Sequence, residues 1–245
     1  MTKNKHTLDG HVLFIIVLVI ATTSCLTVTQ YLQMKTNTNM YNFLTWDIFL
    51  AWTPLFLSIA ITKFFNNDRT MLNKLLIIFL SGAWIFFLPN AAYLFTEIIH
   101  SFRYFERQGE EIFWDKMWFW YSLTIAFVTA IIGLLLSTYS IYQMSKIVNR
   151  IFNKYVSSLF VVFVMLLSSI GVYIGRFNRW NSWDIIDQPK IIMKDILNDW
   201  FKEGSILLEF VTLMFVIQLF CYLVFSAAIR NKNNVRNNEI IHSSR

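Results

Sequence analysis

The chain contains six apolar stretches, each close to the length that a helix needs to cross a lipid bilayer. They lie at approximately residues 12–32, 44–62, 73–89, 117–141, 156–174 and 206–229. A helix rises about 1.5 Å per residue, so about 20 residues cross the ~30 Å hydrocarbon core. Because lipid offers no hydrogen bonds to the backbone, each stretch must form a helix. The sequence therefore predicts an all-α fold, a six-transmembrane-helix bundle.

Composition supports lipid as the main partner of the chain. Of its 245 residues, 56% are hydrophobic and 15% are charged, whereas a soluble domain carries about 25% charge. The net charge of +6 is divided among several loops rather than gathered in one stripe, which argues against nucleic-acid binding. No repeat or flexible linker interrupts the sequence, so residues 1–245 are predicted to form a single integral membrane domain.

Cys25 and Cys221 lie in separate apolar runs near opposite ends of the chain, which argues against a structural disulfide. The usual metal-binding spacings are absent, so the sequence identifies no cofactor and leaves metal dependence open. Lys3 and Lys5 precede the first apolar stretch, as in a signal peptide, but the small-residue cleavage pattern is missing. We interpret this stretch as an uncleaved first helix.

The distribution of basic residues predicts the orientation of the bundle. The two tails and the loops on their side hold twelve Lys or Arg and three acids, whereas the opposite loops hold nine Lys or Arg and nearly all of the remaining acids. Lys and Arg favour the cytoplasmic side, and long loops cross the membrane with little regard to charge. Both termini are therefore predicted to be cytoplasmic, with loops 89–116 and 175–205 outside a bacterial plasma membrane.

Nine tryptophans occur in the chain, and all are predicted to lie near the extracytoplasmic helix ends. Tryptophan belts usually mark both interfaces of a membrane. A one-sided arrangement therefore favours a binding cavity, although an interfacial anchor remains the simpler alternative. The helix at 117–141 carries small residues at four-residue spacing, which favours close packing at the centre of the bundle.

The loop at 89–116 holds a possible acid–base pair. Pro89 is predicted to end the third helix, and Asn90 to cap a new short helix. Glu97 and His100 would then lie three residues apart on one face. Such a pair can share a metal, exchange protons with a substrate, or simply be solvated neighbours.

The loop at 175–205 begins with two arginines, two tryptophans, two asparagines and an aspartate within residues 176–184. Arginine binds phosphate or carboxylate through two parallel hydrogen bonds, and tryptophan faces accept sugars, acyl chains or cations. An acidic neighbour, Asp184, Asp187 or Glu97, is expected to neutralise Arg176 or Arg179. The predicted ligand-binding residues are Asn90, Tyr93, Arg176, Arg179, Trp180, Asn181 and Trp183, and the candidate catalytic residues are Glu97, His100 and Asp184.

Residues of about 190–203, between Pro189 and Gly204, have helix-bracketing ends, one apolar side and one charged side. They predict an extracytoplasmic amphipathic surface helix on the outer leaflet, or alternatively a lid over the cavity. Asp47 and Glu209, near the ends of two apolar stretches, are weaker candidates for functional residues.

Three segments carry a resemblance to a known family. They are Trp46-Asp47-Ile48-Phe49-Leu50-Ala51-Trp52-Thr53-Pro54, then Phe87-Leu88-Pro89-Asn90-Ala91-Ala92-Tyr93 running to Glu97 and His100, and Tyr173-Ile174-Gly175-Arg176-Phe177 running through Trp180-Asn181-Ser182-Trp183-Asp184. Together they resemble bacterial predicted membrane proteins catalogued as domain-of-unknown-function family 1361, over about residues 40–225. The chain departs from the family pattern at Ala92, where proline is more common, and at Glu97, where aspartate is. The resemblance implies a multi-pass membrane protein without an assigned activity.

Three functions remain open from sequence. The first is binding of an anionic or amphiphilic ligand, a lipid or an anionic small molecule, in an outward-facing cavity of Trp, Arg and Asn. The second is an enzyme acting on a lipid-linked or phosphorylated substrate at the outer leaflet. The third is a non-catalytic scaffold or assembly factor, which predicts Trp and Arg side chains that point out of the bundle.

Overall fold

The protein is a bundle of long helices. The computed structural model describes residues 5–36, 41–66, 70–106, 114–180 and 184–243. Its elements are α1 (Lys5–Thr36), α2 (Asn42–Phe65), α3 (Met71–Tyr93), the 3-10 helix η1 (Leu94–Ile98), α4 (Ile99–Glu106), α5 (Met117–Ile151), α6 (Lys154–Tyr173), the π-helical turn η2 (Ile174–Asn178), α7 (Asp184–Asp187) and α8 (Pro189–Ser243). No strand occurs among these described residues.

Six segments of these helices are long and apolar enough to cross a membrane. They are Gly10–Lys35, Asn42–Phe65, Met71–Phe102, Met117–Ile151, Lys154–Asn178 and Gly204–Asn231. Each contains one of the six stretches predicted from the sequence, which confirms an all-α fold with six apolar helices. The chain is a multi-pass integral membrane protein. The helices extend beyond the apolar stretches because their ends carry polar residues that suit the headgroup layers.

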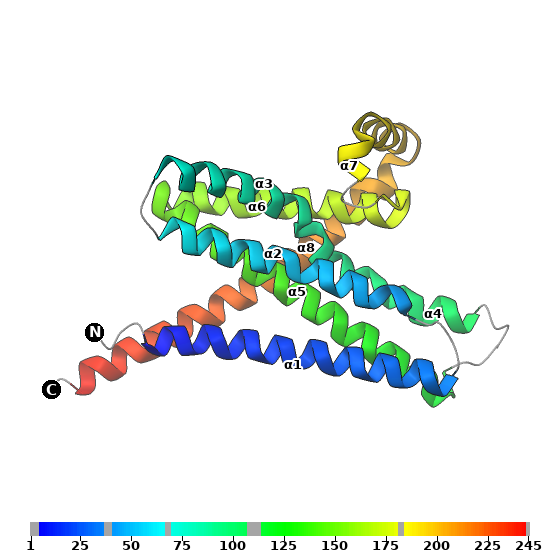
Figure 1. Ribbon diagram of the computed structural model, residues 1–245, viewed down its shortest axis with the longest axis horizontal. Coiled ribbons are helices and arrows are strands. Elements are labelled where there is room, and N and C mark those ends of the chain that lie inside the picture. The colour runs from blue at the N-terminus through cyan, green and yellow to red at the C-terminus, as the bar shows by residue number, and fades with distance from the viewer. Residues whose placement is uncertain (1–4, 37–40, 67–69, 107–113, 181–183, 244–245) are drawn as a thin grey trace.

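Helix α5 lies at the centre of the bundle, where it packs against α1, α2, α3, α6 and α8. In Figure 1 it passes between α1 and the layer formed by α2, α3 and α6. The predicted rows of small residues are buried along it. They are Ser122, Ala126, Thr129, Ala130, Gly133 and Ser137. Small side chains let the neighbouring backbones approach closely, which is the main source of helix association in lipid.

Two tryptophans lie in the middle of the bundle rather than near one set of helix ends. Trp84 is fully buried and donates its indole N–H to the Ser140 hydroxyl at 2.6 Å. Trp52 donates to Thr22 at 3.3 Å. A buried indole needs an acceptor, and serine or threonine on a neighbouring helix supplies one. The expectation that all tryptophans share one end was wrong for this pair.

Pro89 does not end the third helix. Helix α3 continues through it to Tyr93 and then into η1 and α4 without a break. The proline ring packs directly against the Cα of Gly171 on α6, where any side chain would collide with it. Transmembrane helices tolerate an internal proline when neighbouring groups accommodate it. Asn90 is therefore not a cap; its side-chain amide donates to the Phe87 carbonyl at 3.1 Å.

The segment predicted as a separate surface helix forms the first part of α8. Gly204 lies inside this helix and does not end it. Residues 189–203 precede the last membrane-spanning segment, which begins at Gly204. Their placement on the outer leaflet stays a prediction.

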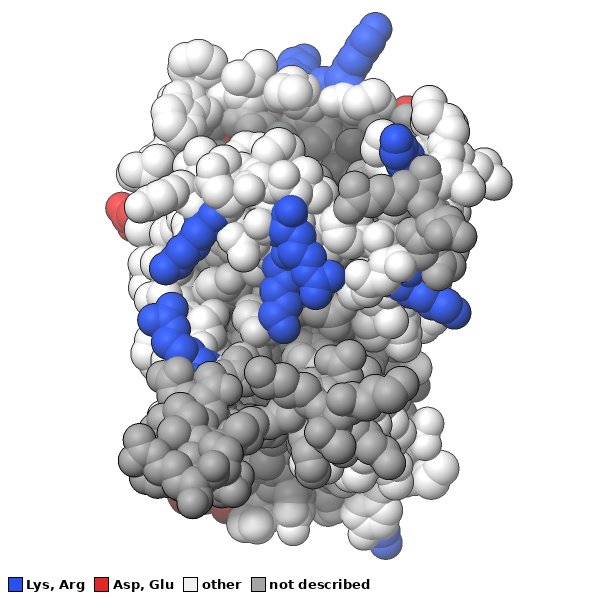
Figure 2. All heavy atoms as spheres, turned by 90° about the vertical axis from the view of Figure 1, so that its left-hand side faces the viewer, with Lys and Arg blue, Asp and Glu red and all other residues white. Residues whose placement is uncertain are grey.

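The two ends of the bundle differ in charge. The start of α1 and the end of α8 lie at the same end (Figure 1). Figure 2 looks onto this end, where Lys and Arg side chains are spread over the described surface and few acidic side chains are visible. We call it the basic end, defined by Lys63, Lys74, Lys146, Arg150, Lys154 and Arg230. The opposite end, which carries η1 and η2, is called the Glu97 end.

Candidate functional site

A cluster of ionisable side chains lies inside the Glu97 end. The Glu97 side chain is 2% exposed, and its Oε1 atom lies 3.3 Å from Nη1 of Arg176. Its Oε2 atom lies 3.2 Å from Nε2 of His100. The same Arg176 nitrogen is 3.4 Å from the His100 ring nitrogen, so the three groups contact one another. Burying a carboxylate is costly unless a cation and hydrogen bonds accompany it, and Arg176 supplies both.

Local backbone geometry brings these residues together. Glu97 belongs to the 3-10 helix η1, and His100 follows in α4. A 3-10 helix has three residues per turn, so residues at i and i+3 lie on the same side. Arg176 comes from the π-helical turn η2 at the end of α6. Such turns are rare in proteins. Those that occur are often found at functional sites, because they redirect side chains that a regular helix would place elsewhere.

Two small residues allow these turns to sit close together. Gly133 of α5 faces the Ala91 carbonyl and the Leu94 side chain, which brings the start of η1 against the central helix. Gly175 leaves room for the Tyr93 ring, whose atoms lie 3.4 Å from the position of a Cβ. The position of Glu97 therefore depends on the close approach of the Ala91 backbone to Gly133, whereas the contact at Gly175 is of ordinary van der Waals length.

Two further groups complete the electrostatic surroundings of Arg176. Asp47 of α2 interacts with both Arg176 and Glu97. Tyr93 interacts with the same two residues and with Asp47. Arg176 is thus a single guanidinium in contact with Glu97 and under the electrostatic influence of a second carboxyl group, Asp47. The cluster consequently carries net negative charge unless it holds a proton or another cation.

Not every polar atom in the cluster has a partner among the described residues. Nη2 of Arg176 is buried and makes no hydrogen bond there, although the side chain as a whole is 15% exposed. His100 is the most accessible member, with 34% of its side chain exposed, and it packs against the Phe43 ring. Buried polar atoms are nearly always paired, so a free donor in such a place suggests a ligand or water.

A second, neutral network supports the cluster from the side of α5. The Tyr41 hydroxyl contacts Ser101 at 2.6 Å and Ser122 at 2.7 Å. Burial raises the pKa of Tyr41 above its ordinary value, so its hydroxyl stays neutral and serves as a hydrogen-bonding group. Tyr41 also has the left-handed backbone angle φ of 62° at the start of α2. These contacts tie α2, α4 and α5 together.

The first turns of α8 are fastened to the turn η2. Asn178 donates its side-chain amide to Asp199 at 2.8 Å, and Tyr173 donates to the same carboxylate at 3.4 Å. Trp180 donates its indole N–H to Asp195 at 3.1 Å. We call Asp195 and Asp199 with these three donors the α8 latch. The charged side of this segment thus faces η2, while Trp200 and Phe201 on the apolar side are 52% and 82% exposed.

The remaining predicted residues are placed less centrally. Asp184 begins α7, and its position relative to Glu97 and His100 stays a prediction. Arg179 follows η2, is exposed, and has a left-handed φ of 59°. Glu209 is exposed on α8, and nothing places it near the cluster. The predicted residues Asn181 and Trp183 lie outside the described residues.

The described side chains do not form an obvious metal centre. Nowhere in the described ranges do three or more His, Cys, Asp or Glu residues lie close enough to hold a metal ion. Sequence reasoning missed Tyr41, Ser101 and the two aspartates of the α8 latch. The repeated acid at positions 195 and 199 was visible as a charged helix side, but its partners on η2 were not.

Comparison with known proteins gives a family and nothing further. A family model described as a protein of unknown function (DUF1361) matches residues 46–221. The match begins one residue before Asp47 and includes every member of the Glu97–His100–Arg176 cluster. A search of curated proteins and a search of solved structures each found no match.

Proposed function

We propose that this chain, which belongs to the DUF1361 family of proteins of unknown function, binds the anionic group of an amphiphilic ligand at Arg176. The observation that carries the proposal is the buried, unpartnered Nη2 atom of a guanidinium whose other nitrogen already contacts Glu97 and His100. A guanidinium held on one side presents a fixed donor on the other, which suits a phosphate or carboxylate oxygen.

Charge balance makes this binding depend on pH. Glu97 already contacts Arg176, Asp47 acts on it electrostatically, and Tyr93 and His100 contribute to its surroundings. An incoming anion would add a third negative charge around one cation. Protonation of a carboxyl group removes that excess, so binding is expected to strengthen as the pH falls.

The first part of α8 supports an amphiphilic ligand. Met193, Leu197, Trp200 and Phe201 on its apolar side are exposed, as expected for a segment lying on the outer leaflet, although Ile192 is buried. The α8 latch holds the segment over η2. Release of the α8 latch would free the Asn178 amide and the Trp180 indole beside Arg176. The charged head of an amphiphilic molecule could then accept hydrogen bonds from these donors while its apolar tail remains in the bilayer.

A second candidate function is an enzyme that acts on a lipid-linked or phosphorylated substrate. The specific observation in its favour is the 3.2 Å contact between Glu97 and His100, since a carboxylate orients an imidazole for proton transfer. The scaffold hypothesis predicts Trp and Arg side chains directed outward. Trp46, Trp114 and Trp120 are exposed, but Arg176 is largely buried, which favours binding over scaffolding.

Native mass spectrometry with decyl phosphate tests the proposal. Purified protein in detergent should bind the probe, and R176Q should weaken binding about tenfold or more, since a hydrogen bond to a charged group contributes about 1.5–3 kcal/mol. K202Q removes an exposed lysine on α8 and is the charge-matched control. Binding by wild-type protein should be stronger at pH 6 than at pH 8. Equal binding by R176Q and K202Q would refute the proposal.

The predicted orientation is tested separately. A cysteine at Arg179, R179C, should react with a membrane-impermeant maleimide on intact cells, because this exposed position follows η2 at the Glu97 end. The wild-type chain, with Cys25 buried and Cys221 partly buried, is the background control. Labelling that appears only after cell lysis would place the Glu97 end in the cytoplasm.

A further inference from the structure

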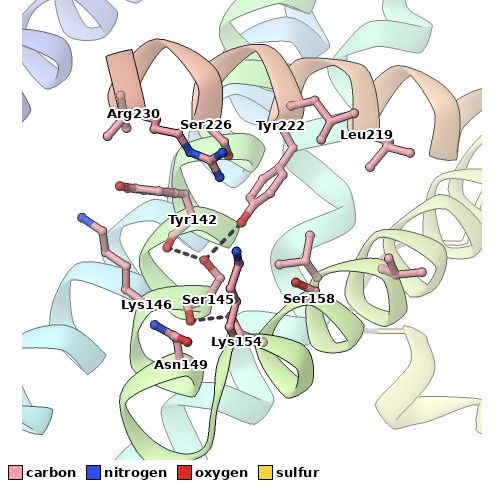
Figure 3. Close-up of a pocket in the computed structure, with 15 residues that line it drawn as sticks. Tyr142, Ser145, Lys146, Asn149, Lys154, Ser158, Leu219, Tyr222, Ser226 and Arg230 are labelled. Atoms are coloured by element: carbon pink, nitrogen blue, oxygen red, sulfur yellow. Dashed lines mark hydrogen bonds between the residues drawn. The ribbon is translucent and has the colours of Figure 1, made fainter. Parts of the chain in front are cut away.

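A cavity of about 720 Å³ opens between α5, α6 and α8 at the basic end, far along the bundle from Glu97. Its volume lies within the ~300–1,000 Å³ range of small-molecule sites. Lys146 of α5, Lys154 of α6 and Arg230 of α8 all line it. Figure 3 shows these three side chains on three different helices: Lys154 extends toward Tyr222, and Lys146 points away from Lys154.

The three cations of this cavity have no acidic partner among the side chains that the structure describes. None of them forms an ion pair with a side chain that the structure describes, and the described lining of the cavity contains no acidic residue. The Lys146 ammonium lies 4.4 Å from the centre of the Tyr142 ring, a cation–π contact that leaves its other side open. Three like charges at one opening repel one another, so an anion between them would be stabilising.

Neutral donors line the inner wall of the cavity. The Tyr222 hydroxyl donates to Ser145 at 3.2 Å, and Ser145 donates to the Tyr142 carbonyl at 2.8 Å. The Ser226 hydroxyl is buried and has no hydrogen-bond partner among the described residues. A hydroxyl in this position can donate to a phosphate oxygen bound between the cations.

The outer wall of the same cavity is apolar. Val162 of α6 and Leu223 of α8 line it, and both are exposed on the surface of the spanning helices, where acyl chains would lie. A soluble phosphate would use only the cations and hydroxyls. A phospholipid would use both walls, since its headgroup enters the cavity while an acyl chain follows the groove between α6 and α8.

We propose that this cavity binds the phosphate headgroup of an anionic phospholipid from the leaflet at the basic end. The Lys146, Lys154 and Arg230 cations hold the phosphate, Ser226 donates to it, and Val162 and Leu223 contact an acyl chain. Basic pockets between transmembrane helices, at the depth of the lipid headgroups, are suited to bind anionic headgroups. The site is independent of the proposed ligand at Arg176.

Lipid titration followed by native mass spectrometry tests this inference on the full-length protein in detergent. The probes are phosphatidylglycerol, zwitterionic phosphatidylcholine and inorganic phosphate. The variant K146Q/K154Q removes two cations of the cavity, and K63Q/K74Q removes two cations of the basic end outside it. Ser158→Trp fills the cavity without changing its charge, because Ser158 lines it. Monodisperse elution on size exclusion verifies that each variant is folded.

Wild-type protein is expected to retain phosphatidylglycerol in preference to phosphatidylcholine. K146Q/K154Q should weaken that binding roughly 30-fold, because each basic residue near a membrane surface contributes about fivefold and the two effects multiply. S158W should also weaken it, whereas K63Q/K74Q should change it less than threefold. Equal weakening by the two double variants would indicate diffuse surface charge and overturn the inference. Displacement of the lipid by millimolar inorganic phosphate would identify a soluble phosphate as the ligand and also overturn it.

Discussion

Gly133 offers a sharp test of how the central helix positions the Glu97 cluster. Its Cα faces the Ala91 carbonyl on α3 and the Leu94 side chain at the start of η1. A Cβ added here would lie 2.8 Å from the Leu94 Cβ and still closer to the Ala91 carbonyl. Because the carbonyl belongs to the backbone, no rotamer change can relieve the collision. The α3–η1 segment must move away from α5.

Gly82 is a matched control in the same protein. It lies in α3, is exposed, and a Cβ added there would meet nothing within 4 Å. Replacing a helical glycine by alanine contributes up to about 1 kcal/mol through reduced backbone freedom. Overpacking a tight contact costs about 1–3 kcal/mol. Gly82→Ala should therefore stabilise the protein slightly, while Gly133→Ala, after the same gain of about 1 kcal/mol, should be destabilised by up to about 2 kcal/mol.

Reversible unfolding in mixed micelles, followed by circular dichroism, measures both variants against wild type. Gly133→Ala should also alter decyl phosphate binding, since moving η1 changes the contact of Glu97 with Arg176, whereas Gly82→Ala should leave it unchanged. The reasoning fails if the two alanine variants are equally stable, because the α5–η1 contact would then have no energetic consequence. It also fails if Gly133→Ala is destabilised but binds normally, because η1 would then be positioned by other contacts.

Two further predictions concern the same end of the bundle. R176M removes the cation that contacts Glu97, so its loss of stability should be larger at pH 8 than at pH 5.5, because an ionised acid without a cation is the costly group to bury. Unfolding at both pH values measures this, and E97Q added to R176M should recover part of the loss. Asp199→Ala removes the acceptor of Asn178 and Tyr173 and should raise amide hydrogen exchange across residues 189–202. Unchanged exchange in that variant would show that the α8 latch does not hold the segment.

Hydropathy alone predicts the six helices because each must satisfy its backbone internally in lipid. It does not predict what happens at Pro89. Proline removes one hydrogen bond and widens the helix locally, and the usual result in water is a helix end. Here the ring packs against Gly171 on α6, 82 residues later in the chain, and α3 continues to Tyr93. The partner that makes proline acceptable is visible only in three dimensions.

The contacts of the candidate site could be predicted in part. Glu97 and His100 are close in sequence, and both helical and 3-10 geometry bring residues at i and i+3 together. The pairing of Glu97 with Arg176 follows from the cost of leaving a buried charge unpaired, although Asp184 and Asp187 were equally plausible partners. The π-helical turn that aims Arg176 has no signature in the sequence. The α8 latch depends on that turn, so it could not be predicted either.

The two ends of the bundle use arginine and lysine in physically different ways. At the Glu97 end, Arg176 is inserted beside acids on other elements, and its charge is largely balanced within the protein. At the basic end, Lys146, Lys154 and Arg230 surround a cavity without a described acid. Internal balance makes a site sensitive to protons, because each neutralised acid changes the net charge. Cations without neighbouring acids make a site attractive to anionic headgroups from the leaflet beside it. The binding of a lipid in the basic cavity should therefore depend little on pH between 6 and 8. The binding of a ligand at Arg176 should depend on pH.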